Sequence, residues 1–226
     1  MVATPRIARS IFAERFPLAQ WRVIGRSLVA DFRAPTFAAA IEFVSDVSRA
    51  SDTAAHHPDI DIRYPGHIRI TLTTHAVNGL TEADASLAHT ISCIAVERGL
   101  TVALNALAST EAAIDAMDIP TVLPFWRAIL GYVNEQPFEP DGIVDAIVDP
   151  LRIGPSIWFQ QMDEPRPQRN RIHFDLVVPH DAAESRITAA VGAGGTILST
   201  EAAPAFWVLA DPEGNEICVC TWQGRD

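Results

Sequence analysis

Four of the seven histidines in this 226-residue chain lie within one segment of twenty residues, HHPDIDIRYPGHIRITLTTH (56–75). They are His56, His57, His67 and His75. Histidine is the side chain suited to moving protons near neutral pH, and a pocket with several imidazoles can use one as an acid and another as a base. A single histidine on a strand usually has no such role, but this density favours an acid–base site.

A metal site is the alternative use of such a cluster. Adjacent residues such as His56 and His57 rarely bind the same ion, and no Cys, Asp or Glu stands at a zinc-like spacing to complete a ligand set. We therefore expect no metal at these histidines.

Helices and strands that could position the histidines can be predicted from periodicity. Residues 8–19 are expected to form a short helix and residues 21–32 a strand pair or an extended arm, and a longer helix follows Pro35. The apolar residues whose helical spacing predicts the buried stripe of the longer helix are Phe37, Ile41, Val44 and Val47.

Two strands are predicted after this helix. Residues 60–64 and 68–72 alternate apolar with polar side chains, and Pro65-Gly66 marks a turn between them. By parity His75 extends the polar face of the second strand, whereas His67 lies at the turn end and is expected to be solvated. If the strands pair, His75 converges with His56 and His57 at one rim of the sheet.

A further helix is predicted from the N-cap Thr81, with Leu87, Ile91 and Ala95 as its buried stripe. Asp84 stands three residues after Thr81, which is the spacing of a capping box. Capping alone would account for Asp84 without any catalytic role.

The gapped motif resembles the pterin-4a-carbinolamine dehydratases over residues 5–98. That family carries an acidic residue, His-His-Pro, an aromatic residue, a distal histidine and a later aspartate, and an upstream signature that resembles Trp21 and DFRAPTF (31–37). One extra residue between the aromatic residue and the distal histidine fits in the predicted turn. The residues of this chain that match the gapped motif are Asp52, His56, His57, Pro58, Tyr64, His75 and Asp84.

The resemblance implies dehydration of 4a-hydroxytetrahydropterin to quinonoid dihydropterin, with a small pterin as the partner and no metal or redox cofactor. It implies that His56 and His75 form the acid–base pair, with either as the acid, and that His57 holds the pterin and Asp84 takes part in catalysis. The residues implied to contact the substrate are Trp21, Asp52, Pro58 and Tyr64.

Residues 99–109 carry no charge and mark the expected boundary between a dehydratase-like domain at 1–99 and a second domain at 110–226. The second domain contains a repeat of one order of elements: a strand, a helix and three strands. The two copies start at Ile114-Asp115 and at Phe174-Asp175. This order predicts an α+β chain: an antiparallel sheet with helices on one face, then a double βαβββ domain.

Residues 110–222 resemble the glyoxalase-like branch of the vicinal oxygen chelate superfamily. The metal enzymes of that superfamily place ligands at four strand positions, and His173 matches one of them. Ala113 occupies the counterpart in the first repeat, and Cys218 stands where a glutamate is usual. Because only Gln160 and Glu216 remain as further candidates, the resemblance implies the fold without the metal.

Strand parity nevertheless predicts a pocket in the second domain. Trp158, Gln160, His173 and Cys218 each point away from the apolar face of their strand. A concave sheet lined by these residues could bind a small planar molecule. Alternatively, they fill a domain or dimer interface.

Composition limits the remaining classes of function. The net charge of −11 argues against nucleic acid or a membrane as partner. The first residues lack the apolar core of a signal peptide, and three cysteines without zinc-knuckle spacing fit a reducing cytoplasm. We expect a cytoplasmic homo-oligomer, with a dimer as the expected state.

The sequence thus predicts a pterin dehydratase with a glyoxalase-like domain of unknown ligand. Two alternatives stay open. One is a pterin-like binding protein without turnover, and the other is a metal-dependent enzyme acting through residues 110–222.

Overall fold

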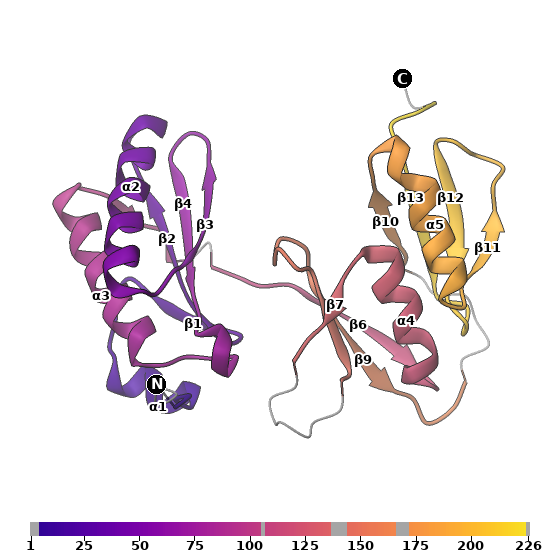
Figure 1. Ribbon diagram of the computed structural model, residues 1–226, viewed down its shortest axis with the longest axis horizontal. Helices are drawn as coiled ribbons and strands as arrows, with labels where there is room; N and C mark the ends of the chain where they lie inside the picture. Colours follow the sequence, from indigo (N-terminus) through magenta and orange to yellow (C-terminus); the bar gives the residue numbers. More distant parts are fainter. Residues whose placement is uncertain (1–4, 105–106, 137–143, 166–171, 225–226) are drawn as a thin grey trace. The chain divides into compact units, whose positions relative to one another are not determined.

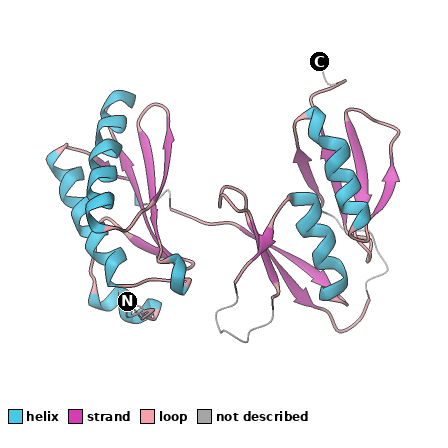
Figure 2. Cartoon of the chain, viewed as in Figure 1, coloured by secondary structure: helices cyan, strands magenta, loops and turns pink. Residues whose placement is uncertain are grey.

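The computed structural model describes residues 5–104, 107–136, 144–165 and 172–224 (Figure 1). The chain divides into two compact units, Met1–Ser109 and Thr110–Asp226. Both units contain helices and strands (Figure 2). None of the described helices combines the length and apolarity that crossing a membrane requires.

The first unit is an antiparallel sheet covered by helices. The strand order is β1-β2-β4-β3, with β5 paired to β2, and helices α2 and α3 lie together on one side of the sheet (Figure 1). The elements are α1 (Arg9–Arg15), β1 (Arg22–Ile24), β2 (Ser27–Arg33), α2 (Phe37–Ala54), β3 (Asp59–Arg63), β4 (His67–Leu72), the short 3-10 helix η1 (His75–Val77), α3 (Glu82–Glu97) and β5 (Thr101–Val102).

The face that α2 buries differs from the predicted stripe. Phe37 and Ile41 are 46% and 45% exposed, whereas Ala40, Phe43 and Val47 are fully buried. The ring of Phe43 packs edge-on against Phe32 of β2, with centroids 5.4 Å apart. Val47 belongs to both possible stripes, so periodicity alone could not choose between them, and the aromatic contact with the sheet decides the rotation of the helix.

The β3–β4 hairpin forms as predicted. Ile68, Ile70 and Leu72 alternate with partly exposed polar residues and are fully buried against the helices. The register pairs Asp59 with Thr71 and Ile62 with Ile68. The start of β3 therefore lies beside the end of β4, at the end of the unit opposite the hairpin turn.

The second unit consists of two βαβββ repeats, each forming a four-stranded sheet in which the first strand pairs in parallel with the last. Helices α4 and α5 pack against each other, and one hydrophobic core draws side chains from both repeats. This confirms the predicted α+β class. The elements are β6 (Glu111–Ala116), α4 (Ile119–Leu130), β7 (Val133–Asn134), β8 (Ala146–Val148), β9 (Ser156–Gln161), β10 (Phe174–Val177), η3 (His180–Ala182), α5 (Ala183–Gly192), β11 (Thr196–Ser199), β12 (Phe206–Ala210) and β13 (Glu216–Cys220).

Candidate active site and a second site in the C-terminal unit

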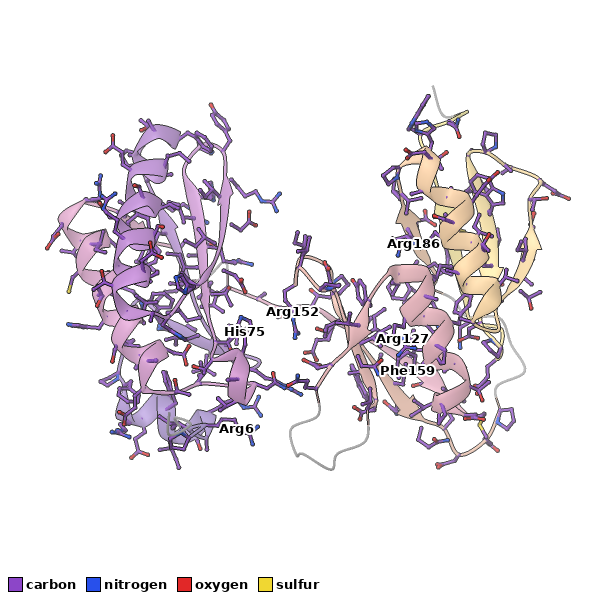
Figure 3. All side chains as sticks on the ribbon, in the orientation of Figure 1. Arg6, His75, Arg127, Arg152, Phe159 and Arg186 are labelled. Atoms are coloured by element: carbon purple, nitrogen blue, oxygen red, sulfur yellow. The ribbon has the colours of Figure 1, made fainter. Side chains whose placement is uncertain are left out.

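The end of α2, the start of β3 and the segment after β4 meet at one rim of the first unit. Helix α2 ends at Ala54 and the next residue turns left-handed, so His56 and His57 follow the helix directly. His75 follows β4 at this same end, away from the β3–β4 turn, as Figure 3 shows. The register of the hairpin thus brings the adjacent histidines and the distal histidine to a common rim.

Asp84 is the centre of a hydrogen-bonded cluster at this rim. Its Oδ1 lies 2.8 Å from Nε2 of His56. Its Oδ2 accepts hydrogen bonds from the Thr74 hydroxyl at 2.7 Å and from the backbone N–H of Thr81 at 2.7 Å. The Asp84 side chain has no exposed surface, and that of His56 is 14% exposed. Asp84 therefore closes the capping box of α3 and also holds a catalytic candidate.

The chemistry of the carboxylate assigns the tautomer of His56. An ionised aspartate can only accept hydrogen bonds, so Nε2 of His56 carries the hydrogen that points at Asp84. In the neutral imidazole, Nδ1 then holds the lone pair. A carboxylate at this place also stabilises the imidazolium that forms when Nδ1 takes up a proton. The pair is therefore arranged to make His56 a proton acceptor through Nδ1.

His57 forms a separate and more open pair with Asp52, which lies in the last turn of α2. Nε2 of His57 is 3.1 Å from Oδ1 of Asp52, and the two side chains are 64% and 73% exposed. An exposed pair of this kind adds little to stability. Pro58 follows and is partly buried just before β3. His57 and Asp52 therefore offer polar groups to a ligand at the rim and contribute little to the stability of the fold.

The predicted position of His75 on the polar face of the second strand is wrong. Strand β4 ends at Leu72, and His75 is instead the first residue of η1. Thr74 pairs with Gly79 across this short loop, and Asn78 takes the left-handed conformation, with φ 46°, that closes it. His75 is exposed and directly follows Thr74, whose hydroxyl donates to Asp84.

Two residues predicted to contact substrate do not join this cluster. Tyr64 is 86% exposed at the turn end of the hairpin, a full strand length, about 17 Å, from the start of β3. Trp21 is 3% exposed in the core, and its indole N–H donates to the Ser92 hydroxyl at 2.9 Å. Thr74 was missed as a member of the site, although a hydroxyl beside the distal histidine was a usable signal.

Comparison with known proteins identifies this first unit. Residues 5–94 match the family model described as pterin 4 alpha carbinolamine dehydratase. A protein of Chloroflexus aurantiacus named "Putative pterin-4-alpha-carbinolamine dehydratase" is 46% identical over 90 residues, which cover 38% of this chain and 94% of that protein. The chain belongs to the pterin-4a-carbinolamine dehydratase family. We call residues 1–109 the dehydratase unit.

Residues 111–220 match the model of a glyoxalase-like domain, so we call residues 110–226 the glyoxalase-like unit. The solved structures that are similar to parts of the chain include the following two. A transcriptional coactivator/pterin dehydratase from Brucella melitensis has 26% identity and a TM-score of 0.38, covering 40% of this chain and 99% of that chain. A glyoxalase/bleomycin resistance protein/dioxygenase family enzyme from Burkholderia phytofirmans has 17% identity and a TM-score of 0.40, covering 50% and 98%.

A cavity of about 830 Å³ lies in the glyoxalase-like unit, beside the edges of β6 and β10. Its described lining includes Ala113, Trp126, Phe174 and Glu216. Ile172, just before β10, and Phe174 of β10 line the cavity; they alternate with His173 and Asp175, which therefore face the opposite side. The described lining includes none of the four residues that were predicted to line a pocket, which are Trp158, Gln160, His173 and Cys218.

The predicted pocket residues instead divide between the two sheets. Trp158 and Gln160 lie on the outward face of β9, where the register pairs them with Ala113 and Asp115 of β6. His173 precedes β10, and Cys218 lies on β13. The two sheets are separate in their strand pairing, which parity within single strands could not reveal.

Three potential metal ligands lie close together on the side of β10 that faces away from this cavity. One donor atom each from His173, Asp175 and Cys218 lies within 4.8 Å of the other two. Nε2 of His173 is 3.5 Å from Oδ1 of Asp175, and the register sets Asp175 beside Cys218. Burial, and then the nearby Asp175 carboxylate, raises the pKa of the Cys218 thiol to about 11.

The sequence predicted the chelate fold without its metal, and that prediction can be compared with this donor set. Ala113 cannot coordinate, but Asp175 supplies a third donor that was absent from the predicted candidates, Gln160 and Glu216. Imidazole, carboxylate and thiolate are the three groups that bind zinc in proteins. The residues present therefore fit a zinc-class ion, although they differ from the ligand set of the superfamily.

Proposed function

We propose that the dehydratase unit dehydrates 4a-hydroxytetrahydropterin to quinonoid dihydropterin. The observation that carries the proposal is the 2.8 Å contact between Nε2 of His56 and the fully buried Asp84 carboxylate. It leaves Nδ1 of His56 as a proton acceptor at the rim where His57 and His75 also lie. Membership of the family supports this choice of reaction.

The reaction requires two proton transfers and no change of oxidation state. Nδ1 of His56 takes the proton from N5 of the pterin as the C4a–N5 double bond forms. The C4a–O bond breaks as the hydroxyl takes a proton from the imidazolium of His75 and leaves as water. His56 then holds the proton that His75 has lost, and exchange with solvent restores both. Positioned groups of this kind contribute about 10²–10⁴-fold each.

The exposed pair of His57 and Asp52 supplies the binding side of the site. Imidazole and carboxylate together offer a hydrogen-bond donor and acceptors. A pterin ring carries both an amino group and a carbonyl group, so it can bind both partners. Pro58 fixes the backbone just after His57 and so orients this pair. Trp21 and Tyr64 have no part in the proposal.

Turnover of a 4a-hydroxypterin by the whole chain tests this function. His56→Ala should lower kcat by about a hundredfold or more. His67→Ala is the matched control, because His67 begins β4 at the opposite end of the hairpin and should leave kcat unchanged. Circular dichroism checks that both variants fold. Binding of the pterin without turnover by the wild-type chain, or wild-type kcat in folded His56→Ala, would contradict the proposal.

A further inference from the structure

The strongest unassigned feature is the group of His173, Asp175 and Cys218 in the glyoxalase-like unit. It plays no part in the proposed dehydration, and it comes from two strands that are far apart in the sequence. Strands β10 and β13 run in parallel, and their register places Asp175 directly beside Cys218. His173 stands two residues before Asp175, so both side chains project from the same face of the chain.

We propose that His173, Asp175 and Cys218 form a three-ligand site for a divalent ion of the zinc class. In a tetrahedral zinc site, donor atoms lie about 3.4–3.8 Å apart. The His173–Asp175 separation is already 3.5 Å, and all three donor atoms lie within 4.8 Å of one another. Small rotations of the two exposed side chains would complete the geometry, because the strand pairing fixes the backbone positions.

The donor set also selects the kind of metal. Magnesium, calcium and manganese prefer sites made of oxygen ligands, whereas a thiolate favours softer or borderline ions such as zinc. One sulfur, one nitrogen and one oxygen donor therefore favour zinc over magnesium. A zinc ion with three protein ligands keeps a fourth position for a small ligand.

Access to the group is consistent with this role. His173 and Asp175 have side chains that are 50% and 57% exposed, so an ion can reach them from solvent. Cys218 is 8% exposed, so it is the most buried of the three donor residues. The cavity beside β6 and β10 is lined from the opposite face of β10, so it is a separate feature.

Metal binding by the whole chain tests the proposal without an enzyme assay. The protein is stripped with a chelator, exposed to excess zinc, desalted and analysed for bound metal. Close to one equivalent should remain on the wild-type protein. His173→Gln, Asp175→Asn and Cys218→Ser should each reduce it to background. Magnesium in place of zinc should not be retained.

Cobalt gives an independent readout of the sulfur ligand. Cobalt-loaded wild-type protein should show a near-ultraviolet charge-transfer band from thiolate to cobalt, and Cys218→Ser should lack it. Cys93→Ser is the matched control, since Cys93 is an exposed thiol on α3 of the dehydratase unit and its loss should change nothing. Circular dichroism checks the fold of every variant.

Two results would overturn the site. One is a wild-type protein that retains no zinc above background. The other is zinc retention that survives both His173→Gln and Asp175→Asn, because these exposed positions can be changed without disturbing the core. If Cys218→Ser does not fold, these two variants still decide the question. Loss of the cobalt band in Cys220→Ser, but not in folded Cys218→Ser, would identify Cys220 as the sulfur ligand and would likewise contradict the proposed site.

Discussion

Oδ1 of Asp84 lies 2.8 Å from Nε2 of His56, although 28 residues separate them in the chain. The same carboxylate caps α3 through Thr81, so the helix start fixes the position of the histidine's partner. The sequence left two explanations of Asp84 open, capping or catalysis. In the structure Oδ1 contacts His56 and Oδ2 accepts the capping hydrogen bond from Thr81, so the two roles are compatible.

Asp84→Asn should separate these two roles. The amide oxygen can still accept from Thr81 and Thr74, but its NH₂ group then faces His56 and forces Nε2 to accept. The lone pair moves from Nδ1 to Nε2, and kcat should fall by about a hundredfold or more, while the melting temperature changes little.

A double-mutant cycle provides the control for this explanation. If Asp84 acts through His56, the double variant His56→Ala with Asp84→Asn should be no slower than the slower single variant. Multiplicative losses in kcat would instead indicate that the two residues act independently.

Thr74→Val should destabilise the dehydratase unit by about 1 kcal/mol. The change keeps the shape of the side chain but removes the hydroxyl that donates to Oδ2 of Asp84 at 2.7 Å. This is the low end of the roughly 1–3 kcal/mol that a buried group left without a hydrogen-bond partner costs, because Thr81 still donates to the same oxygen. Urea denaturation followed by circular dichroism measures the change in the free energy of unfolding.

The matched control for Thr74 is Thr90→Val. Thr90 is exposed on α3, and its hydroxyl donates only to the backbone of its own helix, at Ser86. Equal destabilisation by both variants would mean that the bond to Asp84 contributes nothing beyond an ordinary surface threonine.

Chelation should leave dehydratase turnover unchanged. His56 is bonded to Asp84 and His57 to Asp52, and the proposed reaction moves protons only. The described group of three close metal donors belongs to the glyoxalase-like unit. Turnover is measured before and after exhaustive treatment with EDTA. Loss of activity that returns on adding zinc would place a metal in the dehydration itself.

Much of the site could be predicted because its spacing follows simple periods. Two-residue alternation gave the β3–β4 hairpin, and antiparallel pairing then required His56 and His75 to lie at one rim. The adjacency of Thr74 to the distal histidine was visible in the sequence, but the direction of its hydroxyl was not, since it depends on the left-handed Asn78 that closes the loop after β4. The alternation of apolar residues predicts strands, but it does not predict the backbone conformation of a single loop residue.

The metal donors illustrate a second limit of sequence reasoning. The two-residue period of an extended chain places the side chains of His173 and Asp175 on one face. The contact with Cys218 depends on which strand lies beside β10, and the chain between them contains a helix and two further strands. Pairing partners across such a connection follow from the fold, and so Asp175 was left out of the predicted ligand set.

The turn after β8 is expected to lose stability in acid. The Asp149 carboxylate accepts hydrogen bonds from the backbone N–H groups of Leu151 at 2.9 Å, Ile153 at 3.0 Å and Gly154 at 2.8 Å. The Gly154 N–H contributes most to lowering the pKa of this carboxyl group below its usual value, against the opposing effect of burial.

A carboxyl group whose pKa is lower in the folded state stabilises that state above the pKa of the unfolded chain, about 3.9. The stabilisation is lost as the pH falls through the lower folded-state value. Asp149→Ala should therefore be less stable than wild type at neutral pH, and the difference should shrink as the pH falls below about 4.

Urea denaturation over this pH range, followed by tryptophan fluorescence, measures the effect. Four of the five tryptophans lie in the glyoxalase-like unit, so the signal reports mainly on the unit that contains Asp149. Asp163→Ala, at an exposed carboxylate after β9, is the matched control and should show no such convergence with wild type. A destabilisation by Asp149→Ala that stayed constant from neutral pH to acid would contradict the prediction, because the charge of Asp149 would then contribute nothing to the turn.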